Sequence, residues 1–240
     1  MKLFKHIPNT ITSMNLLCGA LGVIFTLQGA LDIAFCLMLA AAVCDFFDGL
    51  SARLLKAYSP IGKELDSLAD CISFGLLPAI MFHRRMVEGG MTGFVTYIPL
   101  IISVFSALRL AKFNVDERQS ENFIGLATPA SALWCGSLIY AADHGVNTFA
   151  SMLHGPYFIP IASVVLALMM VSDIPMFSMK FKKDSAYNRI RIYFIVIVAA
   201  LAIATLIMKI NWSFIVFLAL TCYIILNVLT ALFSLRITRK

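Results

Sequence analysis

Long apolar stretches alternate with short charged segments along almost the whole chain. Six of these stretches contain no Asp, Glu, Lys or Arg and are long enough, or nearly so, to cross a bilayer: 6–31, 89–108, 122–142, 144–172, 192–208 and 210–235. A membrane-spanning helix needs about 20 predominantly apolar residues. The pattern predicts one spanning helix in each stretch. We expect the first to be retained, because Pro8 and Asn9 interrupt the run that a signal peptide would need.

The region between the first two stretches, residues 32–88, predicts two further spans of a different kind. They cover roughly 32–56 and 63–83, and they are the two that carry charges inside the apolar run: Asp45, Asp48, Arg53, Asp66 and Asp70. Adding them gives about eight transmembrane helices and predicts an all-α, polytopic integral membrane protein. The connections are short and none is rich in Ser, Pro or Gly, so residues 1–240 are predicted to form a single domain.

The composition supports a membrane protein and excludes two other classes. Of the 240 residues, 60% are apolar and 13% are charged, against roughly 45–50% and 25% in soluble domains. Neither a soluble globular enzyme nor a disordered chain has this balance. The six cysteines stand singly in apolar stretches and predict core packing, and no two histidines have the spacing of metal ligands.

The basic residues predict the orientation of the chain in the membrane. There are 19 Lys and Arg against 13 Asp and Glu, a formal net charge of +6. With a cytoplasmic N-terminus, the predicted spans place 16 basic residues inside and 3 outside, namely Arg84, Arg85 and Lys209. This bias follows the positive-inside rule. We therefore expect both termini to be cytoplasmic, and the basic excess requires no nucleic-acid partner.

The four aspartates in the two charged spans predict a metal site. An ionised carboxylate near the bilayer centre costs at least ~2.5–3.5 kcal/mol on insertion scales. Asp45 and Asp48 are three residues apart, and Asp66 and Asp70 are four apart, so each pair lies on one helical face. An antiparallel hairpin would bring the two faces together near its cytoplasmic end. Four oxygen donors without a nearby His or Cys favour Mg²⁺, Mn²⁺ or Ca²⁺.

Neighbouring residues extend this metal site to a phosphate ligand. Gly49 and Gly62 lack side chains and let a bulky ligand approach the backbone closely. Arg53 follows Asp48 by just over one helical turn, and its planar guanidinium suits phosphate. Carboxylates, a divalent ion and an arginine together indicate a phosphoryl-group site.

Residues 45–70 resemble the signature of the CDP-alcohol phosphotransferase family, Asp-x-x-Asp-Gly-x-x-Ala-Arg, eight residues, Gly-x-x-x-Asp-x-x-x-Asp. Every fixed position is met: Asp45, Asp48, Gly49, Ala52, Arg53, Gly62, Asp66 and Asp70. The stretches 7–19, 62–79, 108–114 and 123–132 also resemble the phosphatidylserine synthases within that family. The resemblance covers about the first 130 residues. It implies a six-helix family core over about 1–190, with two additional C-terminal spans over about 191–235.

The resemblance also implies an activity, a cofactor and partners. An alcohol hydroxyl, here that of L-serine, would attack the phosphatidyl phosphorus of CDP-diacylglycerol, and CMP would leave. Asp70 is the expected general base, and a divalent ion, Mg²⁺ or Mn²⁺ with Ca²⁺ possible, would be held by Asp45, Asp48, Asp66 and Asp70. The CDP moiety would lie against Asp48, Gly49, Ala52, Arg53 and Gly62. The family further implies a homodimer in a bacterial cytoplasmic membrane, with the active site on the cytoplasmic side.

The acceptor pocket follows from the chemistry of serine, which brings a carboxylate that a nearby cation would bind. Arg109 is the favoured candidate, with Lys112 beside it at the end of the fourth span. Lys112 stands where the family usually has an arginine, and it offers a single charge instead of a planar fork. Ser73 and Asn114 are candidates for further polar contacts.

Several alternatives stay open from the sequence alone. Arg109 and Lys112 are also typical of topogenic residues that extend to the membrane interface. Either Asn9 or Thr12 would contribute to the substrate cleft, or Asn9 or Thr10 would simply be the N-cap of the first helix.

The function also has alternatives. A sibling enzyme of the family would use glycerol 3-phosphate, inositol phosphate, or serine with an archaeal-type ether lipid. From a different class, a cation or proton-coupled carrier also places carboxylates within its spans, although the repeated halves common in carriers are not evident in the sequence.

Overall fold

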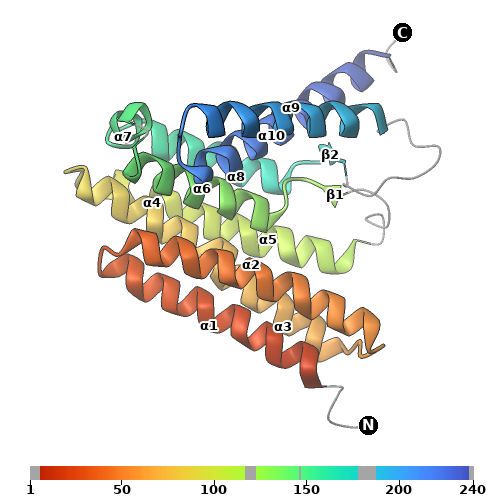
Figure 1. Ribbon diagram of the computed structural model, residues 1–240. Helices are drawn as coiled ribbons and strands as arrows, with labels where there is room; N and C mark the ends of the chain where they lie inside the picture. Colours follow the sequence, from red (N-terminus) through yellow and green to blue (C-terminus); the bar gives the residue numbers. More distant parts are fainter. Residues whose placement is uncertain (1–5, 117–122, 146, 178–187, 238–240) are drawn as a thin grey trace.

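The computed structural model describes residues 6–116, 123–145, 147–177 and 188–237. Helices dominate these residues, with one two-residue strand pair (Figure 1). The elements are α1 (Ile7–Leu27), α2 (Leu31–Leu54), α3 (Pro60–Asp70), the π-helical η2 (Cys71–Leu76), α4 (Leu77–Glu88), the 3₁₀-helical η3 (Phe94–Leu100), α5 (Ile101–Val115), β1 (Phe123–Ile124), α6 (Thr128–Asp143), α7 (Asn147–Leu153), α8 (Phe158–Val171), β2 (Pro175–Met176), α9 (Asn188–Ile207) and α10 (Trp212–Ile237).

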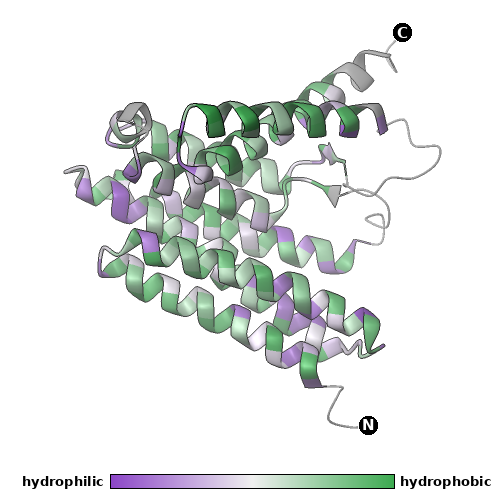
Figure 2. Ribbon diagram, in the orientation of Figure 1, coloured by the Kyte–Doolittle hydropathy of each residue, from purple (hydrophilic) through white to green (hydrophobic). Residues whose placement is uncertain are grey.

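Six of these helical segments are long and apolar enough to cross a membrane, which confirms an all-α polytopic membrane protein. They are α1, α2, the continuous run α3–η2–α4, the run η3–α5, α9 and α10. The second charged span, expected over roughly 63–83, is therefore the middle of a longer helix over 60–88. In Figure 2 the hydrophilic residues of this helix gather near its two ends, and hydrophobic residues cover most of the outer helices.

The other two expected spans differ from the prediction. The single helix expected over 144–172 is wrong, because the chain forms α7 and α8 with a turn between them. Gly155 and Pro156 lie in that turn, and proline lacks the backbone N–H that a continuing helix would use. The stretch 122–142 forms a helix from Thr128 onward, with Pro129 in its first turn. α6 and α8 are 16 and 14 residues long, at or below the shorter end of spanning helices.

The segment before α6 is held by a short antiparallel contact. Phe123 pairs with Met176 and Ile124 pairs with Pro175. Gly125 then has a φ of +77°, and a Cβ there would overlap the backbone of Met170. Only glycine fits this turn without strain. The beginning of α6 is thereby tied to the end of α8.

The α3–η2–α4 helix passes through the middle of the bundle. On one side Gly19 of α1 lies directly against Ser73 of η2. On the other side Gly75 lies against Ser106 of α5, where a Cβ would come within 2.9 Å of the serine Cβ. Small residues of this kind let helices in a membrane pack closely. The η2 segment is therefore clamped between α1 and α5.

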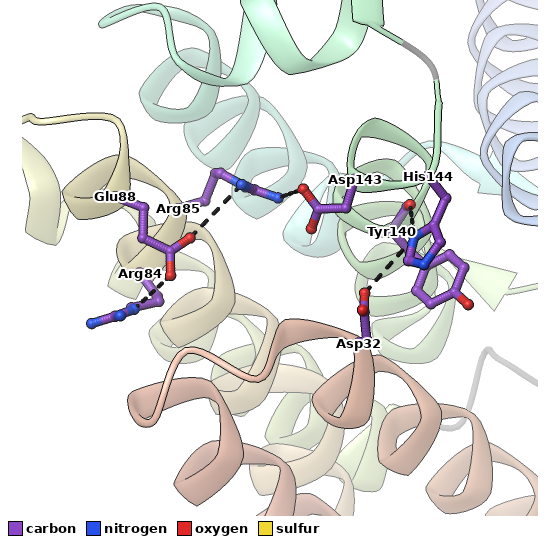
Figure 3. Close-up of polar contacts among 7 residues, drawn as sticks. All are labelled: Asp32, Arg84, Arg85, Glu88, Tyr140, Asp143 and His144. Atoms are coloured by element: carbon purple, nitrogen blue, oxygen red, sulfur yellow. Dashed lines mark hydrogen bonds and ion pairs between the residues drawn. The ribbon is translucent and has the colours of Figure 1, made fainter.

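The two ends of the bundle carry different polar groups. α1 begins, α2 ends, α3 begins and α5 ends on the right of Figure 1. The opposite end holds the ion pairs of Figure 3: Arg84 with Glu88, Arg85 with Asp143 and Glu88, and Asp32 with His144. Acidic partners thus offset the two arginines that the sequence places on the outer side. Several basic residues of the topology prediction lie outside the described residues: Lys2, Lys5, Arg118, Lys180, Lys182, Lys183, Arg239 and Lys240.

Candidate functional site

Three carboxylates from two helices converge at the end of the bundle where α2 ends and α3 begins. Oxygens of Asp45, Asp48 and Asp66 lie within 4.8 Å of one another. Asp48 is buried, and the other two are half-buried. The helical spacing that predicted a shared face for Asp45 and Asp48 is therefore confirmed, and the hairpin brings Asp66 to the same place.

Local sequence explains how α3 enters this hairpin. Ser59 is its N-cap, with extended backbone angles, and its Oγ accepts a hydrogen bond of 3.0 Å from the N–H of Gly62. Pro60 occupies the first turn, where its fixed φ suits a helix and its missing N–H costs nothing. This start places Asp66 on the second turn of α3, level with the last turns of α2.

Phe46 and Phe47 lie between the two α2 aspartates in sequence, and their side chains point to the outside of the bundle. Their exposed fractions are 66% and 51%, and their rings pack edge to face at 5.6 Å. α2 therefore presents carboxylates to the bundle interior and aromatic rings to the outside on successive residues.

One face of α1 supplies polar groups to the carboxylates. Thr12 Oγ1 donates a hydrogen bond of 2.6 Å to Asp48 Oδ2. Asn15 Nδ2 donates a hydrogen bond of 3.2 Å to Asp70 Oδ1. Both α1 side chains are buried. Thr12 was expected at the cleft from the sequence and Asn15 was not, although Asn9, Thr12 and Asn15 recur every three residues on one face of α1.

A cavity of about 200 Å³ lies beside the carboxylates. Its walls come from the start of α1, the end of α2 and the start of α3: Pro8, Asn9, Thr12, Asp48, Gly49, Ala52, Ala57, Tyr58, Ser59, Gly62, Lys63 and Asp66. Four of the five residues expected to contact the CDP moiety thus line one cavity: Asp48, Gly49, Ala52 and Gly62. Arg53 does not line it; its side chain is exposed, with Nη2 near Gly49.

The cleft interpretation of Asn9 and Thr12 fits this cavity better than the N-cap interpretation. The N-cap residue of α1 is His6, and no side chain caps the helix there. Thr10 Oγ1 donates to the carbonyl of His6, so Thr10 is not the N-cap either. Asn9 faces Gly62, where a Cβ would lie 2.9 Å from Asn9 Oδ1. Gly62 therefore leaves room for the Asn9 side chain at the cavity wall.

The donor set fits a hard divalent cation. Three carboxylates this close repel one another unless a positive charge lies between them. In the described part of the chain, the buried Oδ1 of Asp66 has no hydrogen-bond partner, which is unusual for a buried carboxylate oxygen. All-oxygen ligands are those that Mg²⁺, Mn²⁺ and Ca²⁺ prefer. Asp70, the fourth predicted ligand, lies one turn beyond Asp66, and its Oδ1 accepts a hydrogen bond from Asn15 Nδ2.

Arg109 of α5 is buried close to the carboxylates. Its side chain is within electrostatic range of Asp70 and Asp45, and Nη1 donates to Thr128 Oγ1 at 3.2 Å. The guanidinium also stacks over Phe113 at 5.4 Å. With a residue exposure of 7%, the Arg109 side chain packs inside the bundle, which favours the pocket interpretation over a side chain that extends to the membrane interface.

The other three acceptor candidates are held by protein contacts. Lys112 Nζ lies 3.1 Å from Asp173 Oδ1, and both side chains are well exposed. Asn114 Nδ2 donates to Ser67 Oγ at 2.9 Å, and the backbone carbonyl of Asn114 accepts from Lys63 Nζ at 2.7 Å. Ser73 is buried, and its hydroxyl donates to the backbone carbonyl of Asn15 at 2.9 Å. Asn114 thus ties α5 to α3 next to the carboxylates, whereas Ser73 ties η2 to α1.

Comparison with known proteins places this geometry in a family. The family model for CDP-alcohol phosphatidyltransferase matches residues 5–173. A CDP-diacylglycerol–serine O-phosphatidyltransferase of Bacillus subtilis is 31% identical over 188 residues, which cover 77% of this chain and 96% of that protein. The protein of the same name from Mycobacterium tuberculosis H37Rv is 33% identical over 178 residues, 71% of this chain and 60% of the relative. An archaetidylserine synthase of Methanothermobacter thermautotrophicus is 35% identical over 136 residues, 56% of this chain and 58% of the relative.

Proposed function

Because the chain belongs to the CDP-alcohol phosphatidyltransferase family, we propose that it transfers the phosphatidyl group of CDP-diacylglycerol to the hydroxyl of L-serine, giving phosphatidylserine and CMP. The observation that carries the proposal is the convergence of Asp45, Asp48 and Asp66 beside a cavity lined by Gly49 and Gly62. The names of the bacterial relatives support serine as the acceptor. The family is one of phosphatidyltransferases, which argues against a carrier.

The cavity suits the CDP part of the lipid substrate. Gly49 presents backbone to it and Ala52 adds only a methyl group, so a nucleotide diphosphate can approach α2 closely, while Gly62 makes room for Asn9 at the wall. Arg53, exposed next to Gly49, is placed to pair with a phosphate oxygen at the cavity rim. Lys63, which also lines the cavity, adds a second positive charge.

Asp45, Asp48 and Asp66, with Asp70 as a further ligand, would hold one or two divalent ions, Mg²⁺ or Mn²⁺, with Ca²⁺ also compatible. A bound ion of this kind offsets negative charge on the diphosphate and on the leaving CMP. Thr12 contributes by fixing one oxygen of Asp48 through its 2.6 Å hydrogen bond. The hydrogen bond would hold the Asp48 carboxylate in place beside the cavity that it lines.

Asp70 is the proposed general base. A serine hydroxyl is a poor nucleophile at neutral pH, and a positioned carboxylate typically contributes ~10²–10⁴-fold. Asp70 would take the hydroxyl proton while the serine oxygen bonds to the phosphatidyl phosphorus. The bond from that phosphorus to the oxygen of CMP breaks, and CMP leaves with the electron pair. Burial of Asp70 keeps water, a competing acceptor, away from the reacting atoms.

Arg109 is the proposed ligand of the serine carboxylate. It is buried, it lies within electrostatic range of Asp70, and its Nε has no hydrogen-bond partner within the described residues. A free N–H on a buried guanidinium is suited to a carboxylate oxygen. Lys112 and Asn114 would act at the edge of this pocket, and Lys112 would first have to leave Asp173. The Ser73 hydroxyl donates to the backbone carbonyl of Asn15, which favours a role in supporting α1 over contact with the serine substrate.

The placement and assembly of the enzyme are also proposals. The basic residues support an active site and both termini on the cytoplasmic side. The bacterial relatives support a bacterial cytoplasmic membrane, and the family resemblance supports a homodimer. The family match ends at residue 173, before α9, which agrees with a core over about 1–190 and two additional C-terminal spans over about 191–235.

The test is CMP release by the purified, detergent-solubilised protein. CDP-diacylglycerol and Mg²⁺ or Mn²⁺ are supplied, with L-serine, glycerol 3-phosphate or inositol phosphate added separately. Release that requires both serine and the metal is expected. Release with another alcohol alone would overturn the acceptor, and no release with any would overturn the function. A parallel assay with CDP-archaeol decides the lipid backbone, a choice raised by the archaetidylserine synthase relative.

A further inference from the structure

We propose that Asn15 is a positioning residue that holds the carboxylate of Asp70 in its reactive orientation. The proposal rests on the proposed function of Asp70 as the base. Asn15 lies in α1, and its side chain is fully buried. Its Nδ2 donates to Asp70 Oδ1 at 3.2 Å, the one hydrogen bond found for that carboxylate within the described residues. A base held by a single donor depends on that donor for its direction.

The unused capacity of the Asn15 carboxamide argues for a role in the reaction. Its Oδ1 is buried and has no partner in the described part of the chain. Buried polar atoms are nearly always hydrogen-bonded, because leaving one unpaired destabilises the fold. An apolar residue of similar size, such as leucine, would fill the same space without this cost. What asparagine adds at this position is the donor to Asp70.

The backbone at Asn15 is itself fixed against the segment that follows Asp70. Ser73 Oγ donates to the carbonyl of Asn15 at 2.9 Å. Asp70 and Ser73 are three residues apart and both face α1. Asp70 is the last residue of α3, and Ser73 lies in the π-helical segment η2. Single-turn π segments inside α-helices are frequent at functional sites.

The close approach of α1 depends on Gly19, one turn after Asn15. A Cβ at Gly19 would overlap Ser73 Oγ and lie 2.7 Å from Ser73 Cα. No larger side chain fits without moving α1 or η2. The contact of Gly19 with Ser73 and the bond of Ser73 to Asn15 therefore set the distance from Asn15 to Asp70. In this arrangement Ser73 supports Asn15 and does not bind the serine substrate.

The test compares Asn15→Leu and Asn15→Asp with the wild-type enzyme, using the full chain in detergent with both substrates. Both variants match asparagine in size and lack its donor; the aspartate also adds a like charge beside Asp70. We expect kcat to fall about 10- to 100-fold, the range typical of residues that orient a functional group. The KM values for CDP-diacylglycerol and for serine should stay within about twofold, because neither substrate touches Asn15 in this proposal.

A double-mutant cycle separates positioning from general damage. Ser73→Ala should lower kcat several-fold with an unchanged serine KM, and it should have no further effect in the Asn15→Leu background. A raised serine KM in Ser73→Ala would instead return Ser73 to the acceptor pocket and overturn its supporting role. Should the Asn15 variants not fold, Ser73→Ala alone carries this kcat-against-KM comparison.

Two controls remove buried polar groups far from the carboxylates. Thr26→Ala, also in α1, deletes a hydroxyl that donates a hydrogen bond to the backbone carbonyl of Gly22 in the same helix. Asn227→Ala, in α10, deletes a buried carboxamide that accepts from the N–H of Phe177. Neither should change kcat. Wild-type kcat in Asn15→Leu, or an equal loss in Thr26→Ala, overturns the proposal. If only an acceptor other than serine is used, the proposed function fails, and the same comparison is made with that acceptor.

Discussion

Thr12 and Asp48 join α1 to α2 through a buried hydrogen bond of 2.6 Å, although they are 36 residues apart in the chain. The bond fixes one carboxylate oxygen of Asp48, a member of the cluster with Asp45 and Asp66. α1 therefore takes part in the site even though the signature of the family lies wholly in α2 and α3.

We expect Thr12→Val to weaken metal activation. Valine keeps the shape of threonine but removes the donor, so Asp48 is free to rotate away from the cluster. The concentration of Mn²⁺ or Mg²⁺ that gives half-maximal CMP release should rise about 10- to 100-fold, as for other partners of metal-binding carboxylates. A metal titration measures this, with Thr26→Val as the control on the same helix. An unchanged titration would remove Thr12 from the metal site.

Asp70→Asn should abolish turnover and spare binding of the lipid substrate. The amide keeps the size of the carboxylate but cannot take the hydroxyl proton from serine. We expect a loss of at least ~10²-fold in kcat, measured as serine-dependent CMP release, with CDP-diacylglycerol binding retained. Activity above a few per cent of wild type would exclude Asp70 as the base. Asp32→Asn, at the opposite end of the bundle, is the matched control.

Arg109→Lys and Arg109→Ala should both raise the KM for serine far more than the KM for CDP-diacylglycerol. Lysine keeps the charge but loses the planar pair of donors, so its effect should be the smaller of the two. Loss of a charge-assisted bond of about 1.5–3 kcal/mol corresponds to a rise of roughly 10- to 150-fold in Arg109→Ala. Lys112→Ala should change the serine KM much less, because Lys112 is exposed and paired with Asp173. Equal effects at the two positions would contradict the assignment of Arg109.

Gly62→Ala should impair binding of the CDP moiety through a steric effect on Asn9. The added methyl would lie 2.9 Å from Asn9 Oδ1 and 3.0 Å from Ser59 Oγ, so the neighbouring side chains must shift at the cavity wall. We expect a rise of about tenfold in the KM for CDP-diacylglycerol with little change in that for serine, which corresponds to roughly 1.4 kcal/mol. Adding Asn9→Ala should recover part of the loss, and a double variant no better than Gly62→Ala would argue against this contact.

The sequence predicted the site formed by the aspartates better than the helices formed by residues 144–172. The aspartates carried their own signal, since ionisable residues are rare within spans and the i, i+3 spacing of Asp45 and Asp48 fixes a common face. The break between α7 and α8 was missed because the run 144–172 contains no Asp, Glu, Lys or Arg, and the prediction did not place the end of a helix at Gly155 and Pro156. An apolar run long enough to span does not by itself show that the helix is continuous.

Asn15 and Arg109 show what hydropathy and motif spacing leave out. Asn15 shares one face of the first helix with Asn9 and Thr12, but nothing in the sequence identifies its hydrogen-bond partner Asp70, which lies 55 positions away. The burial of Arg109 likewise depends on Thr128 and Phe113, which approach it only in the folded bundle. Such pairings arise from packing between helices and have no periodic signature in the chain.

The rings of Phe46 and Phe47 face outward between two aspartates that face inward. This arrangement affects how the enzyme would encounter its lipid substrate. The carboxylates of the proposed reaction site and these exposed rings are one residue apart on the same turn of α2, so under the proposed function the rings would lie against the acyl chains. The nucleotide headgroup can thus enter the cavity while the hydrocarbon tails stay in the surrounding leaflet. Encounter then takes place by lateral diffusion in two dimensions. Turnover should follow the mole fraction of CDP-diacylglycerol in a micelle or vesicle, so that adding inert lipid at a constant bulk amount of substrate slows the enzyme by surface dilution.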